Sequence, residues 1–324
     1  MNQQTLGKTK VAISSVGLGG FELGGNDPAV GDPTLPEATD VLETALAAGM
    51  NWLDTSERYH QNRNESLIGD ALQSTSSEML VATKLFPAPN GTGFRREEVH
   101  AGCRASLKRL RREHIDIYFL HWPDLTGVPI DETWGAMSEL VDQGLVRAIG
   151  LSNYKMKQVE QCHEQRSVDV IQVGLSLVDH LYQRTRIARC AELGIGAVTY
   201  EPFAGGILTG RSLDQVREVQ ADYTAFPFYQ RLLLPGKAEQ SFAVAEGMRS
   251  IAERLGISIA QLAIAWVLHQ TGVTAALAGS RRPANVRQNA LAADSHLTQD
   301  VLAELEALIP LGPTMAETPG DAHA

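Results

Sequence analysis

Four ionisable residues lie at or just beyond the ends of three consecutive apolar segments. The segment NWLDT carries Asp54, with Tyr59 five residues further on; LVATK ends at Lys84, and IDIYFLH ends at His121. A phenol has a pKa of about 10 and is a poor acid at neutral pH, but a neighbouring ammonium lowers that pKa. We therefore predict Tyr59 as a proton donor, Lys84 as the cation that lowers its pKa and Asp54 as the anchor of Lys84. His121 would hydrogen-bond and orient a substrate oxygen.

Each residue also has an ordinary structural explanation when it is taken alone. Asp54 could belong to a loop or helix cap, Lys84 could be a solvated strand end, His121 a core histidine and Tyr59 a rim aromatic. Their joint occurrence at corresponding segment ends favours a site. Carbonyl reduction needs a group that protonates the oxygen, and no side chain can supply the hydride, so the site implies a nicotinamide cofactor.

The segments that position these residues alternate between short apolar runs and longer stretches of helical period, which is typical of βα units. Eight such runs fit a closed α/β barrel, the (β/α)8 or TIM fold, better than an open doubly wound sheet, because every run is followed by a helical crossover. In such a barrel the chemistry lies at the C-terminal ends of the strands. The predicted strands are 16–20, 51–55, 80–84, 115–121, 146–152, 169–175, 196–202 and 273–279.

Several segments go beyond the bare repeat. TLGKTKVAIS, before the first strand, has β character around a Gly-Lys turn and predicts a hairpin that plugs the bottom of the barrel. Residues 205–240 form an unusually long connection, which is usually functional, although a self-packed surface loop is the alternative. Helices are predicted at 241–256, 258–270 and 297–309. We expect one barrel domain over 1–310 and a flexible tail over 311–324. The long connection carries four aromatic residues, Tyr223, Phe226, Phe228 and Tyr229.

Composition narrows the function classes. The 324 residues carry a formal charge of -10, which disfavours nucleic acid and anionic membrane surfaces as partners. The N-terminus lacks the pattern of a secretory signal and no uncharged apolar run reaches about 18 residues, so we expect a cytoplasmic protein that acts on a small molecule. The sequence has no HxH metal pattern, and GLGGFELGG lacks the GxGxxG spacing of a Rossmann dehydrogenase. We expect three separate reduced thiols, at Cys103, Cys162 and Cys190.

Seven motifs stand in a characteristic order along the chain: NWLDTSERY, VATK, FLHWPD, GLVRAIGLSN, VIQV, TYEPFAGGILTG and GSRRPANVRQN. With them the sequence resembles the aldo-keto reductase superfamily over roughly residues 8–310. The resemblance implies a (β/α)8 barrel that uses NAD(P)H, with Asp54, Tyr59, Lys84 and His121 as its catalytic tetrad. It implies reversible reduction of an aldehyde, ketone or keto-sugar carbonyl to an alcohol, as in an NADP-preferring carbonyl reductase or alcohol dehydrogenase.

The resemblance also implies a cofactor site along the strand ends. The family's carboxamide contacts fall on Ser152, Asn153 and Gln172, and its stacking aromatic falls on Tyr200. Two adjacent arginines near a helix start suit a 2′-phosphate, so NADPH is favoured; Asn285 stands where some relatives carry an arginine, so NADH stays open. The implied pyrophosphate contacts are Gly205, Gly206, Ile207, Leu208, Thr209 and Gly210, and the implied contacts at the adenosine end are Gly279, Ser280, Arg281, Arg282, Asn285, Gln288 and Asn289.

Two departures from the family pattern need an explanation from structure. Glu201 stands where Ser is common, so it must point away from the phosphates, pair with an arginine or alter the site. His60 replaces the usual Gly after the tetrad tyrosine, either as a substrate contact or as a loop residue. Phe21, Phe86 and Trp122 are expected to wall the substrate pocket. The alternative function is a nicotinamide-binding regulatory or sensor subunit with little turnover, and the oligomeric state is left open.

Overall fold

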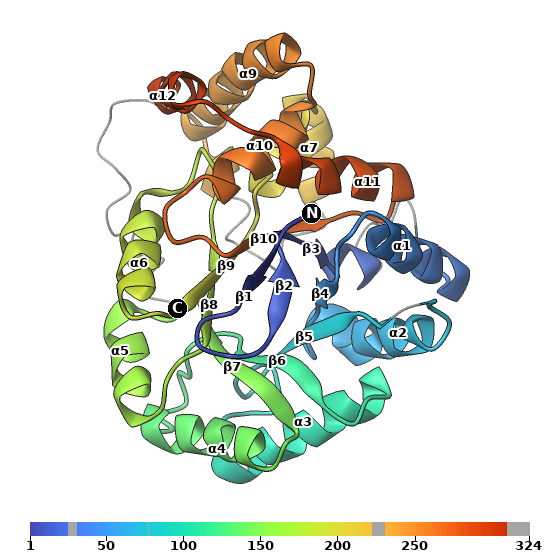
Figure 1. The fold of residues 1–324 in the computed structure, drawn as a ribbon, viewed down its shortest axis with the longest axis vertical. Coiled ribbons are helices and arrows are strands. Elements are labelled where there is room, and N and C mark those ends of the chain that lie inside the picture. Colours follow the sequence, from blue (N-terminus) through green and yellow to red (C-terminus); the bar gives the residue numbers. More distant parts are fainter. Residues whose placement is uncertain (25–30, 77, 222–230, 310–324) are drawn as a thin grey trace.

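The computed structural model describes residues 1–24, 31–76, 78–221 and 231–309. Eight parallel strands close into a barrel in the order β10-β3-β4-β5-β6-β7-β8-β9, and helices surround it (Figure 1). The closed order confirms the predicted (β/α)8 barrel and excludes the open sheet. All eight predicted strands are present, each within two residues of its predicted ends: β3 Val16–Gly19, β4 Trp52–Asp54, β5 Leu80–Leu85, β6 Ile115–Leu120, β7 Val146–Ser152, β8 Val170–Gly174, β9 Gly196–Tyr200 and β10 Ala275–Gly279.

The predicted N-terminal hairpin is also present. Strands β1 (Gln3–Thr5) and β2 (Ala12–Ser14) pair antiparallel and lie across one end of the barrel (Figure 1). Leu6 and Ile13 are buried in one apolar cluster with inward-facing residues of the barrel strands, such as Trp52. The Trp52 indole donates a hydrogen bond to the Ser14 carbonyl at 2.9 Å. The hairpin therefore closes the barrel bottom, opposite the strand ends where the chemistry was expected.

A larger apolar cluster lies between the barrel and its helices. Helix α1 begins with a capping box between Thr34 and Glu37, and α10 begins with one between Ser258 and Gln261. The three helices predicted after the long connection correspond to α9, α10 and α12. The helices are α1 Leu35–Ala47, α2 Arg63–Leu72, α3 Arg96–Leu110, α4 Ile130–Asp142, α5 Met156–Gln165, α6 Leu181–Glu192, α7 Leu213–Ala221, α9 Lys237–Leu255, α10 Ile259–Leu268, α11 Pro283–Leu291 and α12 Gln299–Ala307.

The long connection after β9 is more regular than its sequence indicated. It contains the 3-10 segment η3 (Ala204–Thr209), helix α7, the short turn η4 (Arg231–Leu233) and the start of α9. Helix α7 was not predicted. The four aromatic residues of this connection, Tyr223, Phe226, Phe228 and Tyr229, and the tail 311–324 lie outside the described residues.

The three cysteines are free and buried. Burial raises the pKa of each thiol, Cys103, Cys162 and Cys190, to about 12. Such thiols stay protonated at neutral pH and are poor nucleophiles. No single helix in the described part of the chain is long and apolar enough to cross a membrane; α9 and α10 meet that test only as a pair, which is bent by 94°.

Candidate active site

Three neighbouring strands bring the tetrad together at one mouth of the barrel. Asp54 ends β4, Lys84 lies near the end of β5, and His121 follows β6 directly. Tyr59 begins the 3-10 segment η2 (Tyr59–Asn62). The Lys84 ammonium donates to an Asp54 carboxylate oxygen, to the Thr55 carbonyl at 2.8 Å and to the Tyr59 hydroxyl at 3.0 Å. The carboxylate, ammonium and phenol predicted from the sequence therefore form one connected chain.

The Lys84–Asp54 pair is buried, with side-chain exposures of 0% and 5%. Burial lowers the pKa of Lys84 and raises that of Asp54, while the contact between the two charges opposes both shifts. The second Asp54 oxygen accepts a hydrogen bond from the Gln172 amide at 2.9 Å. Gln172, expected to hold a cofactor carboxamide, thus supports the tetrad through Asp54, a contact that the sequence did not indicate.

The Tyr59 hydroxyl is less acidic than the sequence predicted. Burial raises its pKa well above the usual value, and the negative charge at Asp54 and the neighbours Tyr200, Glu22 and Glu201 raise it further. Lys84 does not outweigh these effects, which is contrary to the prediction that it lowers the pKa. Tyr59 therefore keeps its proton at neutral pH, which is the state that a proton donor needs.

His121 is neutral in this environment. Burial lowers its pKa well below the usual value, and the charges of Lys84 and Arg58 lower it further. Its Nδ1 lies 3.0 Å from the Ser56 hydroxyl, which also approaches the Lys84 carbonyl at 3.4 Å. We assign the hydroxyl hydrogen to the shorter contact, so that Nε2 carries the ring hydrogen and can donate to a substrate oxygen.

Aromatic rings surround the two polar groups that face substrate. The Phe21 ring meets Tyr59 edge-on at 5.0 Å, and Phe86 meets His121 edge-on at 5.4 Å. The Trp122 ring stacks near His121 at 6.4 Å. The structure therefore brings all three predicted pocket aromatics to the tetrad, where they form an apolar rim.

The predicted nicotinamide side is organised around Asn153, which adopts a left-handed conformation (φ 66°) after β7. Its amide nitrogen donates to the His121 carbonyl at 3.1 Å and to the Ser152 hydroxyl at 3.1 Å. Its amide oxygen accepts from the Tyr200 hydroxyl at 2.8 Å. These bonds hold Ser152, Asn153 and Tyr200 in one layer next to His121.

Glu201, the first departure from the family pattern, also has a left-handed backbone (φ 64°). Burial and the nearby Glu201 charge raise the pKa of Tyr200, while the Arg186 charge opposes them. At the Tyr200 hydroxyl, Arg186 therefore offsets part of the effect of Glu201.

The predicted pyrophosphate run lies in η3 and bends sharply. Gly205, Gly206 and Gly210 all have positive φ, and the Gly206 and Leu208 amides donate to the Phe203 carbonyl at 3.0 Å. The Ile207 and Leu208 side chains are buried in the core, so only their backbone could meet a cofactor. Thr209 closes the turn by donating to the Gly206 carbonyl at 2.6 Å.

Arg211 is a residue that the sequence reasoning missed. One of its guanidinium nitrogens lies 3.0 Å from the position that a Cβ on Gly206 would take, so a cation stands against the glycine run. A pocket of about 330 Å³ adjoins this run and is lined by Gly210, Arg211 and Arg249, among others. A basic residue directly after a Gly-rich turn was the available signal, because both features favour an anion.

At the predicted adenosine end the two arginines differ. Arg281 donates to the Gly31 carbonyl at 2.6 Å, whereas Arg282 is exposed where α11 begins. The Arg282 amide donates to the Ser280 hydroxyl at 3.1 Å. Asn285 and Gln288 are exposed on α11, while Asn289 is buried. These residues follow Gly279 at the end of β10.

The second departure, His60, has a backbone explanation. His60 has φ 50° and is followed by Gln61 and Asn62, which are also left-handed. Glycine adopts this conformation without steric cost, which accounts for the Gly usual in the family. The His60 ring lies 3.2 Å from an Asp32 oxygen, and Arg63 lies 3.1 Å from the other. In this structure His60 therefore serves as a loop residue that ties η2 to Asp32.

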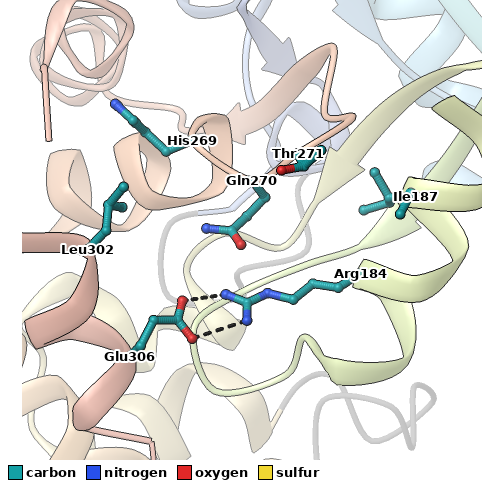
Figure 2. Close-up of a pocket in the computed structure, with 8 residues that line it drawn as sticks. Arg184, Ile187, His269, Gln270, Thr271, Leu302 and Glu306 are labelled. Atoms are coloured by element: carbon teal, nitrogen blue, oxygen red, sulfur yellow. Dashed lines mark hydrogen bonds and ion pairs between the residues drawn. The ribbon is translucent and has the colours of Figure 1, made fainter. Parts of the chain in front are cut away.

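A further pocket, of about 370 Å³, contains none of the predicted site residues (Figure 2). It is lined by Arg184 and Ile187 of α6, Leu302 and Glu306 of α12, and the residues that follow α10. Two bonds join the Arg184 guanidinium to the Glu306 carboxylate across it. This pocket is therefore not the predicted site.

The comparisons with known proteins agree with this geometry. The family model described as the Aldo/keto reductase family matches residues 15–310. The chain belongs to the aldo/keto reductase family. It is 31% identical to a probable aldo-keto reductase 1 of Glycine max, over 95% of this chain and 88% of that protein. It is 28% identical to proteins described as probable voltage-gated potassium channel subunit beta from Oryza sativa subsp. japonica and Arabidopsis thaliana, over 98% of this chain and 99% of each relative.

Solved structures of aldo-keto reductases share the fold. A glycerol dehydrogenase from Gluconobacter oxydans superposes with a TM-score of 0.81 at 26% identity, over 97% of this chain and 99% of that one. A thermostable aldo-keto reductase in complex with the inhibitor epalrestat gives 0.75 at 27% identity, over 95% and 100% of the two chains. Aldo-keto reductases use a nicotinamide cofactor to reduce carbonyl compounds.

The chain's own features fit such a cofactor. The left-handed glycines of η3 bring backbone close to the Arg211 cation, a combination that suits phosphate. Asn153 and Tyr200 present a polar group and an aromatic ring beside His121. A nicotinamide dinucleotide would thus be held by Ser152, Asn153 and Tyr200 at one end and by the residues after Gly279 at the other.

Proposed function

We propose that the protein is an NAD(P)H-dependent oxidoreductase that reversibly reduces an aldehyde, ketone or keto-sugar carbonyl to an alcohol, with Tyr59 as proton donor. The observation that carries the proposal is the 3.0 Å contact between the Lys84 ammonium and the Tyr59 hydroxyl, backed by Asp54 at the barrel mouth. The bound coenzyme supplies the hydride. The absence of a membrane-spanning helix among the described ones is compatible with the cytoplasmic location that we infer.

The chain's residues divide the remaining work. His121 donates from Nε2 to the substrate oxygen and orients it, and Tyr59 delivers its proton to that same oxygen. The high pKa of Tyr59 is no obstacle, because an alkoxide is a stronger base than a phenolate. Lys84 then stabilises the phenolate that remains, and Asp54 holds Lys84 in position. Phe21, Phe86 and Trp122 limit the access of water.

The experiment that tests this function is coenzyme oxidation by the purified protein with a panel of aldehydes, ketones and keto-sugars, using NADPH and NADH in parallel. We expect turnover of at least one carbonyl class. Binding of coenzyme without turnover of any member of the panel would overturn the proposal.

That last outcome would support a second function, a nicotinamide-binding regulatory subunit with little turnover. The similarity to proteins described as probable potassium channel β subunits favours it. A single-turnover measurement with prebound NADPH and the carbonyl panel separates the two functions, because an enzyme must consume its bound coenzyme at least as fast as its steady-state turnover.

For the coenzyme we propose a preference for NADPH, with Arg281 and Arg282 near the 2′-phosphate. Arg282 is exposed and Arg281 is bonded to the Gly31 carbonyl, so we expect Arg282→Ala to weaken NADPH binding more than Arg281→Ala, by about tenfold. NADH binding should change less in both variants. Equal losses for the two coenzymes would contradict the assignment.

A further inference from the structure

Glu22 is an acidic side chain at the barrel mouth that the tetrad chemistry leaves without a role. It lies on η1 (Phe21–Gly24), the short turn that follows β3. The position of this turn is fixed, because the Gly20 amide donates to the Asp54 carbonyl at 2.8 Å and the Gly20 carbonyl accepts from Asn64 at 2.9 Å. Glu22 is therefore held close to the backbone that carries Asp54.

The Glu22 carboxylate folds back over the neighbouring strand. Gly19 on β3 pairs with Gly279 on β10, and the Glu22 carboxylate lies directly against Gly279. A Cβ at position 279 would overlap a carboxylate oxygen, so a larger residue there would displace the Glu22 carboxylate from this place. Glu22 thus occupies the strand end between the barrel mouth and the residues Ser280–Arg282.

This location lies on the route of the proposed coenzyme, so the inference rests on the proposed function. A dinucleotide that reaches from Tyr200 and Asn153 on one side to Ser280 and Arg282 on the other must pass the end of β10, where Glu22 lies. Its phosphates are anionic. A carboxylate on that route would repel them, whereas a neutral carboxyl group could donate a hydrogen bond.

The surroundings favour the neutral form. Burial, followed by the negative charge of Asp54, raises the pKa of Glu22 to about 7, against a backbone hydrogen bond that lowers it. The other titratable or charged groups on the elements packed against η1 are Tyr59 and His60 on η2, and Arg63, Glu65 and Asp70 on α2, with Arg281 following the paired strand β10. Glu22 also helps to raise the pKa of Tyr59, so its charge is felt at the proton donor.

We propose that Glu22 is a positioning residue of the coenzyme cradle that is protonated whenever the dinucleotide is bound, so that coenzyme affinity is coupled to pH through this one side chain. Phosphates near Glu22 favour its protonated form, and by linkage protonation favours coenzyme binding. Affinity should be constant at low pH and should fall by up to tenfold per pH unit above about 7.

The test is the dissociation constant of NADPH, measured from coenzyme fluorescence between about pH 6 and about pH 9. The variants are Glu22→Gln, which is isosteric and cannot ionise, and Glu22→Ala. His60→Gln is the matched control on the adjacent element. We expect the parent and His60→Gln to share the same slope. Both Glu22 variants should give flat profiles, and Glu22→Gln should bind at high pH about as tightly as the parent does at low pH.

Two outcomes would overturn the inference while leaving the function intact. If the Glu22 variants keep the parent's pH slope, another group is responsible. If Glu22→Gln binds more weakly at every pH, the ionised carboxylate is the binding form. A parent that binds neither coenzyme at any pH would instead overturn the proposed function, and this inference with it.

Discussion

Two ion pairs that link distant parts of the chain lie in very different surroundings. Lys84 and Asp54 meet at the barrel mouth with side-chain exposures of 0% and 5%. Arg184 and Glu306 join α6 to α12 on the outside of the barrel, with exposures of 30% and 37% (Figure 2). The buried pair carries the larger desolvation cost, which makes it the weaker candidate for a purely stabilising role.

Among the described residues, the outer pair makes its bonds within its own cluster, apart from the buried Arg184 Nε, which has no hydrogen-bond partner there. The Trp266 indole donates to Glu306 at 3.0 Å, and the Arg184 guanidinium lies 4.9 Å from the Trp266 ring centre. The His180 ring packs edge-on against the same indole at 5.7 Å. Burial raises the pKa of Glu306, but the hydrogen bond and charge of Arg184 outweigh it, so the pKa lies below its usual value. These contacts hold α6, α10 and α12 together. We call this set the outer cluster: Arg184, Glu306, Trp266 and His180.

At the mouth, by contrast, one bond of the pair goes to a group that can react. Lys84 donates to the Tyr59 hydroxyl, which stands among rings at the rim and not inside a closed cluster. The comparison indicates that a functional ion pair is recognised by a further hydrogen bond to a group that can react, and not by its burial alone. Five substitutions test this contrast.

The largest effect is expected for Tyr59→Phe. Phenylalanine keeps the ring contacts with Phe21 and His121 but removes the proton, so kcat should fall by about 10²- to 10⁴-fold. The thermal midpoint and the coenzyme dissociation constant should stay near the parent values. Steady-state kinetics measure kcat, a thermal melt measures the midpoint, and a coenzyme titration measures the dissociation constant. A variant that keeps most of its kcat would remove Tyr59 from the mechanism.

The next effect concerns stability and the outer cluster. Burial and the Arg184 charge lower the pKa of His180 to about 4. At pH values between the usual pKa of histidine and about 4, His180 binds a proton in the unfolded chain but not in the folded chain. The free energy of unfolding therefore falls on acidification through this pH window, by about 3 kcal/mol.

His180→Phe should abolish that part of the pH dependence, because the ring is retained and cannot ionise. Urea unfolding at about pH 7 and about pH 4.5, for parent and variant, gives the comparison. The variant should lose less stability than the parent over this interval, with kcat at neutral pH unaltered. Identical losses would mean that His180 does not titrate in this window.

Several contacts behind this contrast could not be predicted from the sequence. The strand ends that carry Asp54, Lys84 and His121 could be predicted, because alternating apolar runs fix the barrel and the barrel fixes which ends meet. The bond between Gln172 and Asp54 joins residues 118 positions apart across the barrel interior, and the bond between Arg184 and Glu306 joins residues 122 apart. No local pattern encodes such distances.

The direction of the Tyr59 pKa was mispredicted for a related reason. The sequence predicts a lysine and an aspartate at neighbouring strand ends. The burial of Tyr59 and the approach of the Glu22 and Glu201 charges depend on the folded rim, which the sequence does not show. The left-handed turn at His60 could have been anticipated from the glycine that is usual there, since a positive φ is what glycine favours.

A moderate effect is expected for Glu306→Ala. The substitution leaves the Arg184 guanidinium and the Trp266 indole N–H without their shared acceptor. The Arg184 side chain is 30% exposed and can be hydrated, whereas the indole N–H of the buried Trp266 cannot, so the free energy of unfolding should fall by about 1–3 kcal/mol. Activity with the best carbonyl substrate should be unchanged. A fall in kcat without a fall in stability would connect this cluster to the chemistry and undo the contrast.

The smallest effect is expected for Arg184→Lys, which keeps the charge but loses the second bond to Glu306 and the flat contact with Trp266. At a partly exposed site these should amount to less than about 1 kcal/mol, read as a shift of the urea midpoint. The reciprocal change, Lys84→Arg, is the matched control. Lys84 is fully buried and its compact ammonium reaches three acceptors at once, and a planar guanidinium cannot reproduce that geometry. We expect Lys84→Arg to lower kcat, by no more than Tyr59→Phe does, while Arg184→Lys leaves kcat intact. If both variants kept the parent's kcat, the mouth would tolerate either cation, and the distinction between a reacting pair and a locking pair would fail.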